Sequence, residues 1–154
     1  MISAIHFKTI IICCMSTFLF PLHAESQGTK ANKMLFAIAG QSNAVGQGDS
    51  TKSTDCAGLP CYEYNVVRNC TQPLKDPVGQ KWMLLERANT GSVGPSFAKR
   101  MHELTHSDIY IVAAARGGAS CHRKAWLSPY NTWDERGGIF SDATAKIDKA
   151  IACC

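Results

Sequence analysis

The stretch Phe36–Gly48, with the sequence FAIAGQSNAVGQG, decides which fold this chain is predicted to adopt. It begins inside Lys30–Ala39, a short apolar run bounded by polar residues and by glycine, which is typical of a buried strand. After Gly40 the composition changes at once to Gln-Ser-Asn and two further glycines. We therefore expect Ser42 just past a strand end, where a helical turn aims free backbone N–H groups at its hydroxyl.

A second strand and a first long helix are predicted further along the chain. Asp108–Ala115 is a continuous apolar run rich in β-branched residues, which indicates another buried strand. Pro95–His106 is predicted to be helical, because proline suits the first helical turn. One face of that helix is apolar and consists of Phe97, Met101 and Leu104.

The C-terminal part of the chain predicts a second long helix. It spans Ser141–Cys153, and Ser141 is a suitable N-cap residue. Its apolar stripe consists of Ala143, Ile147, Ala150 and Ile151. Asp49–Lys81 is predicted to be a loop because it is rich in proline, glycine, asparagine and aspartate. Trp82–Ala88 is apolar but too short to assign.

This order of elements predicts an α/β fold, a three-layer sandwich with a parallel sheet. Strands that are apolar throughout and alternate with amphipathic helices are typical of a sheet covered on both faces. In such sheets the ligand crevice lies at the carboxyl ends of the strands. The segments GQSNAVGQG (40–48) and RGGAS (116–120) both leave from such ends, so we expect them to line one crevice.

Ser42 in this position is a candidate nucleophile, since it could attack a carbonyl carbon while its own N–H binds the oxyanion. Two other motif types fit less well. The stretch lacks the glycine and lysine spacing of a phosphate-binding loop, and Ala44 stands where a nucleophile elbow has its second glycine. A helix N-cap serine in a glycine-rich turn is the structural alternative, and local features alone favour it.

The N-terminal segment 1–24 is predicted to be a secretory signal peptide. It has a short basic start, an apolar run and a plausible cleavage edge at Ala24. We therefore expect a secreted or periplasmic protein without a stable membrane span after cleavage, whose mature part, 25–154, is one domain. The net charge of +4 is dispersed along the chain, which disfavours a nucleic-acid partner.

Cysteine usage agrees with export. The mature part holds six cysteines, and an oxidising compartment favours disulfides between them. The sequence assigns no pairs: the six cysteines are Cys56, Cys61, Cys70, Cys121, Cys153 and Cys154. Metal binding is the poorer interpretation, because no second ligand pair follows at metal-binding spacing.

Four stretches in order resemble the SGNH hydrolase superfamily, and most closely its branch of carbohydrate acetylesterases and sialate O-acetylesterase-like proteins. They are GQSNAVGQG (40–48), SVGPSFAKRM (92–101), VAAARGGASCHRKAW (112–126) and GGIF (137–140). The resemblance implies a flavodoxin-like SGNH fold. It also implies a serine esterase that removes acetyl groups from carbohydrate hydroxyls through an acyl-enzyme, with no metal or organic cofactor.

Carried over by position, the resemblance makes Ser42 the nucleophile and Gly94 a second oxyanion donor, with Gly91 as the alternative. For Gly94, a plain turn before a helix is an equally good interpretation. The remaining implied site residues line the pocket floor or brace the serine loop, although those after the second strand fit a tight turn as well. They are Gly117, Gly118 and Ser120 for the floor, and Gln41 and Asn43 for the loop.

Three aromatic residues are candidate platforms for a sugar ring: Trp126, Tyr130 and Trp133. An aromatic face packs against the apolar face of a pyranose, although such residues more often pack in the core or at its rim.

The resemblance also implies catalytic partners that this sequence does not show. In the family an Asp-x-x-His segment near the C-terminus supplies the base and its orienting carboxylate, and no such segment occurs before the end at KAIACC. We therefore expect a domain truncated at its C-terminal side, with an exposed sheet edge and a catalytic rate that has largely been lost. His122 is a weak candidate for a substitute base. The alternatives are a non-catalytic carbohydrate-binding remnant and an inactive gene fragment.

Overall fold

The computed structural model describes residues 32–128 and 130–154, so the predicted signal segment, 1–24, lies outside the described residues. Four strands form one sheet in the order β1-β4-β2-β3. Their bounds are β1 Lys33–Gly40, β2 Cys61–Asn65, β3 Cys70–Pro73 and β4 Asp108–Ala115. β4 runs parallel to both β1 and β2, and β3 is antiparallel to β2.

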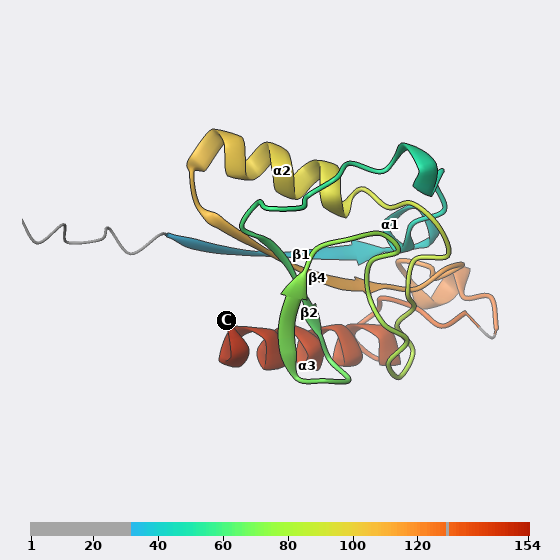
Figure 1. The fold of residues 1–154 in the computed structure, drawn as a ribbon. Helices are drawn as coiled ribbons and strands as arrows, with labels where there is room; N and C mark the ends of the chain where they lie inside the picture. The colour runs from blue at the N-terminus through green and yellow to red at the C-terminus, as the bar shows by residue number, and fades with distance from the viewer. Residues whose placement is uncertain (1–31, 129) are drawn as a thin grey trace, which may run out of the picture.

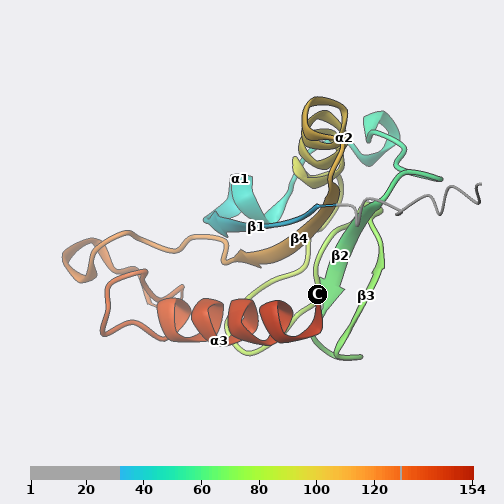
Figure 2. The ribbon, with the colours of Figure 1, turned by 90° about the vertical axis from the view of Figure 1, so that its left-hand side faces the viewer.

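Two long helices cover opposite faces of this sheet, α2 (Gly94–Thr105) on one side and α3 (Gly138–Cys153) on the other (Figure 1). The turned view in Figure 2 shows the sheet between them. The predicted α/β three-layer sandwich is therefore confirmed, and its sheet is mainly parallel, with β3 as the antiparallel strand. Three short helices lie in the connections: α1 (Ser42–Val45), η1 (Ser50–Lys52) and η2 (Arg123–Ala125). No helix of the described part is long and apolar enough to cross a membrane.

The core forms around β4, whose residues from Ile109 to Ala115 are all buried. Successive side chains of a strand point to opposite faces, so an apolar strand between two helices contributes to both sides of the core. On the α2 side, the Phe36 ring meets the Phe97 ring edge-on with centroids 5.0 Å apart. On the α3 side, Val112 packs with Ala150.

The loop prediction for 49–81 is wrong over β2 and β3, which form a hairpin inside it. Prolines at both ends of the hairpin and the polar residues within it concealed the strands. Two of those polar residues, Glu63 and Asn65, are buried and bonded within the fold: the Glu63 carboxylate accepts from Gly79 N–H at 2.7 Å, and Asn65 Nδ2 donates to Gln72 Oε1 at 2.8 Å.

The predicted start of the last helix is also wrong. α3 begins at Gly138 with Gly137 as its N-cap, and Ser141 is an exposed residue inside the helix. The cause is Ile139, which is fully buried and fixes the first turn against the sheet. At the other end, Ile151 is 63% exposed and therefore does not belong to the buried stripe.

The predicted face of the first long helix is correct in part. Phe97 and Met101 pack against the core cluster, whereas Leu104 is 59% exposed. β1 lies at one edge of the described sheet, and three of its residues, Lys33, Ala37 and Ala39, are exposed.

Candidate active site

Ser42 emerges at the carboxyl end of β1, beside the end of β4. The two strands pair in parallel with Gly40 opposite Ala115, so both leave the sheet at the same level. Figure 2 shows α1 and the connection after β4 on the same side of the molecule. Gly40 has φ +145°, and a Cβ there would lie 3.0 Å from the Ala44 side chain. The sharp turn into α1 therefore requires glycine at this position.

The Ser42 side chain is half-buried, and its hydroxyl donates a long hydrogen bond of 3.5 Å to Gln41 Oε1. Within the described part of the chain, the backbone N–H groups of Ser42 and Asn43 have no acceptor. The loop thus offers a hydroxyl and two free amide groups on adjacent residues, which is the donor arrangement that a developing oxyanion needs.

Gly94 and Gly91 have amide groups that are already engaged. Gly94 N–H donates to Ser92 Oγ at 3.3 Å, and Gly91 N–H donates to the Gly48 carbonyl at 2.9 Å. Ser92 is held in turn by the Asp76 carboxylate, which accepts from its hydroxyl at 2.6 Å. The oxyanion role of Gly94 stays a prediction, and it requires the bond to Ser92 to be exchanged for one to substrate.

Glu86 fixes the turn after β4, and no local sequence pattern predicts this role. Its Oε2 accepts from Gly117 N–H at 2.8 Å, and its Oε1 lies 3.0 Å from the Arg116 guanidinium. Gly118 follows with φ +71°, and the Tyr130 ring lies so close that a Cβ at position 118 would clash with it at 2.6 Å. Tyr130 therefore covers the predicted pocket floor at Gly118.

The loop between β4 and α3 returns to the exit of β1. The Ser120 carbonyl accepts from Thr132 Oγ1 at 3.0 Å and from Trp133 N–H at 2.8 Å. The Trp133 indole N–H donates to the Gly40 carbonyl at 3.2 Å. Trp133 is half-buried and packs against the core, so it joins the two loops and does not present a free ring face.

Trp126, by contrast, is 54% exposed and lines a hollow of about 440 Å³ together with Arg123 and Arg136. The hollow also contains Asp134, whose Oδ1 lies 3.8 Å from Arg136 Nε. Hydrogen bonding from the Arg136 backbone N–H lowers the pKa of the Asp134 carboxyl, so this carboxylate is ionised at neutral pH.

Asp134 is also the carboxylate that sequence reasoning did not find for His122. His122 Nε2 lies 3.9 Å from Asp134 Oδ2, and Nδ1 accepts from Lys124 N–H at 3.1 Å. The ring thus has a carboxylate on one nitrogen and a backbone donor on the other. In this arrangement neither nitrogen is free to take a proton from a serine.

His102 and His106 lie at the C-terminal end of α2, just before β4 begins. They are therefore near the amino end of β4, whereas Ser42 lies past the carboxyl end of β1. His102 Nδ1 is bonded to the Ser107 carbonyl at 2.8 Å. Within 32–128 and 130–154, no group of three or more His, Cys, Asp or Glu side chains could hold a metal ion.

A family model for carbohydrate esterases, described as sialic acid-specific acetylesterases, matches residues 32–152. No curated protein matches the chain. Among solved structures, a protein from Arabidopsis thaliana is similar, with a TM-score of 0.58 and 16% sequence identity. The alignment covers 78% of this chain and 51% of the Arabidopsis chain, so this chain spans about half the length of that relative, and the likeness concerns the fold. The family match covers most of the sequence, and the chain therefore belongs to the carbohydrate esterase family of sialic acid-specific acetylesterases.

Proposed function

We propose that this chain carries the nucleophile of a secreted or periplasmic serine esterase that removes acetyl groups from carbohydrate hydroxyls. The observation that carries the proposal is the pairing of Gly40 with Ala115, which supports a site where Ser42 stands between the two loops at the carboxyl edge of the sheet. Membership of a carbohydrate esterase family supports the ester substrate.

In the proposed reaction, Ser42 Oγ forms a bond to the acetyl carbonyl carbon, and the carbonyl oxygen takes up negative charge. The free N–H groups of Ser42 and Asn43 are suited to stabilise that charge. The bond to the sugar oxygen then breaks, and the sugar leaves as an alcohol with the proton from Ser42. Water attacks the acetyl-serine in a second step and releases acetate.

Removal of the proton from the Ser42 hydroxyl is the difficult step of this reaction for the residues that the structure describes. His122 is the described histidine that follows the end of β4, and both of its ring nitrogens face other groups. It could accept the Ser42 proton only after the Lys124 N–H contact is released. We therefore propose slow turnover, since a serine without a poised base keeps only the part of the rate that oxyanion stabilisation and binding supply.

Hydrolysis of a chromogenic acetate ester by the full chain tests the proposal. Ser42→Ala should lower the hydrolysis rate at least tenfold, whereas the exposed Ser141→Ala control should leave it unchanged. A fluorophosphonate probe adds a readout that does not require turnover, since it should label the tryptic peptide 34–52 only when Ser42 is present. Equal hydrolysis and equal labelling in Ser42→Ala would reject the proposal.

A non-catalytic carbohydrate-binding role is the second candidate, and the exposed Trp126 ring beside Arg123 and Arg136 favours it. Titration calorimetry with an acetylated oligosaccharide should show binding that Trp126→Ala weakens severalfold. Leu127→Ala is the matched control, because Leu127 is 66% exposed and next in sequence but is not among the residues of the hollow. Binding without hydrolysis would favour this role over the esterase.

A further inference from the structure

Two buried cysteines, Cys56 and Cys61, lie side by side at the entrance to β2. Cys61 is the first residue of the strand, and Cys56 belongs to the connection that precedes it. Their exposures are 6% and 1%, and both belong to the apolar cluster under α2. The two thiols are near enough that each affects the pKa of the other.

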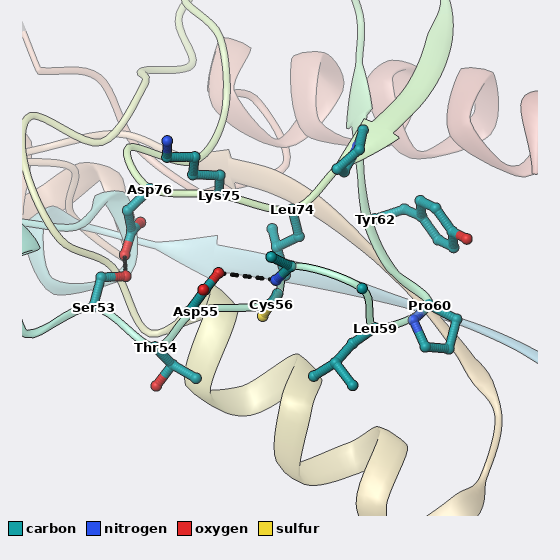
Figure 3. Close-up of a pocket in the computed structure, with 13 residues that line it drawn as sticks. Ser53, Thr54, Asp55, Cys56, Leu59, Pro60, Tyr62, Leu74, Lys75 and Asp76 are labelled. Carbon is teal, nitrogen blue, oxygen red and sulfur yellow. Dashed lines mark hydrogen bonds between the residues drawn. The ribbon is translucent and has the colours of Figure 1, made fainter.

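Cys56 is anchored from a second direction. Its Sγ donates to the Pro95 carbonyl in the first turn of α2 at 3.5 Å. Figure 3 shows the Cys56 sulfur directed toward the start of that helix, with the Leu74 side chain close by. The sulfur therefore has a fixed position against the first turn of α2.

We propose that Cys56 and Cys61 are a disulfide pair, which closes a ring over residues 56–61. The chain between them turns back on itself, since Leu59 N–H donates to the Cys56 carbonyl at 3.1 Å and Cys61 N–H donates to the Leu59 carbonyl at 2.8 Å. The turn returns the chain to the same buried cluster, so we expect bond formation to require little change of the backbone.

The oxidation needs an electron acceptor, for which a low-molecular-weight disulfide such as oxidised glutathione serves. One protein thiolate attacks the small disulfide, forms a mixed disulfide and releases one small thiol. The second protein thiolate then attacks the protein sulfur of the mixed disulfide, which closes the ring and releases the second small thiol. In total the two cysteines lose two protons and two electrons, and the oxidant is reduced to two thiols.

If the protein folds with both thiols free, their burial makes later formation of the disulfide slow. Desolvation raises the pKa of the Cys56 thiol and raises that of Cys61 to about 11, so the reactive thiolate is scarce at neutral pH. The bond should therefore form while the chain folds. A folded, reduced sample should react with an alkylating agent at these two thiols roughly tenfold or more slowly than at the exposed Cys121.

The ring has a structural consequence for the cavity beside it. Residues 56–60 line a hollow of about 730 Å³, together with Tyr62 and Leu74 among others (Figure 3). Closing the ring removes conformational freedom from this part of the lining and from the unfolded chain. We expect the oxidised protein to unfold at a temperature roughly 5–10 °C above that of the reduced protein.

The sequence permits a clean assignment by peptide mapping. Trypsin cleaves after Lys52 and Arg68, so Cys56 and Cys61 share one peptide that contains no other cysteine. The other four cysteines of the described part fall in three further peptides, 69–75, 117–123 and 150–154, the last of which holds both Cys153 and Cys154. A disulfide inside peptide 53–68 makes it two hydrogen atoms lighter and protects both thiols from alkylation, whereas a bond from Cys56 or Cys61 to any other cysteine links two peptides.

The experiment refolds the full chain in a glutathione redox buffer, quenches it with acid and maps the peptides before and after reduction. The proposal expects peptide 53–68 to be internally linked, in the natural chain and in the Cys121→Ser control alike. A thermal scan then compares each protein oxidised and reduced, and the difference should vanish in Cys56→Ala/Cys61→Ala. Alkylation of both thiols in the refolded sample, or a link from either one to another peptide, would overturn the pairing.

Discussion

The indole Nε1 of Trp133 donates a hydrogen bond to the carbonyl oxygen of Gly40 at 3.2 Å, across 93 residues of sequence. The same carbonyl accepts from Arg116 N–H at 3.0 Å. The last residue of β1 is therefore bonded to both parts of the loop that follows β4. Because Ser42 is two residues further on, the position of its hydroxyl depends on contacts made late in the chain.

Trp133→Phe should weaken this junction while keeping an aromatic ring in the core. Loss of the indole donor and of part of the ring should lower the free energy of unfolding by about 1–2 kcal/mol, measured by urea denaturation. Trp126→Phe is the matched control, because Trp126 is largely exposed and should give a change within about 0.5 kcal/mol. Equal losses in the two variants would show that the Gly40 contact contributes nothing.

Glu86→Gln should loosen the turn at Arg116 and Gly117. The Arg116 side chain is only 19% exposed, so it would keep a poorly solvated charge beside a neutral amide. We expect a loss of about 1–2 kcal/mol in unfolding free energy. Glu103→Gln is the control, since the ion pair of Glu103 with Arg100 lies on the surface and contributes about 0.5 kcal/mol or less. A Glu86 variant no less stable than the control would contradict this account.

Gly46→Ala should displace α1 and with it Ser42. Gly46 has φ +107°, and a Cβ there would lie 2.7 Å from Ser92 Cβ and 3.0 Å from Ala88 Cβ. Gly58→Ala is the matched control, because Gly58 also has a positive φ, of +76°, but has nothing within 4 Å of the added carbon. Thermal unfolding should show a clearly larger loss for Gly46→Ala, and fluorophosphonate labelling of Ser42 should fall only in that variant. Similar losses would mean that backbone strain, not packing, governs both sites.

The elements that could be predicted from the sequence are those whose signal is local. The strand Asp108–Ala115 has the predicted bounds because it is apolar throughout, and α2 differs from its prediction by a single residue at each end. The hairpin of β2 and β3 could not be predicted, since buried polar residues such as Glu63 are satisfied by partners elsewhere in the chain. Gly79 N–H, which bonds Glu63, is 16 residues away.

The residues of the candidate site, too, could be predicted only where their signal is local. Ser42 follows a strand and precedes a turn, which is a pattern within a dozen residues, and its place at the carboxyl edge followed from that pattern. Glu86 and Asp134 act through contacts that close only in the fold: Glu86 reaches Gly117 across 31 residues, and Asp134 meets His122 from the far side of a loop. A sequence pattern identifies the element that carries a functional group, but not the partners that hold it.

Lys146 should make the stability of the protein depend on pH above neutrality. Its side chain is fully buried under β4, where Nζ donates to the Ala113 carbonyl at 2.7 Å. Desolvation lowers its pKa from 10.5 to about 8, and the buried Glu63 carboxylate opposes the shift. Below about pH 8 the folded state carries a costly buried charge, whereas the unfolded state keeps its proton up to about pH 10.5.

The unfolded state therefore binds more protons than the folded state between these two values, and the contribution of Lys146 to stability rises with pH in that window. Between pH 7 and pH 9 the gain should be on the order of 1 kcal/mol. Above pH 9 the opposite effect of Cys61 begins, because its raised pKa of about 11 favours the unfolded state there when the thiol is free.

Urea denaturation of the reduced protein at pH 7, 8 and 9 measures this contribution. Lys146→Met keeps the length of the side chain but cannot titrate, so its stability should lack the rise seen in the natural chain. Lys149→Met is the matched control, since Lys149 is exposed on the same helix and its loss should leave the rise intact. If the natural chain and Lys146→Met showed the same pH dependence, the Lys146 charge would cost nothing inside the fold, contrary to the desolvation that lowers its pKa.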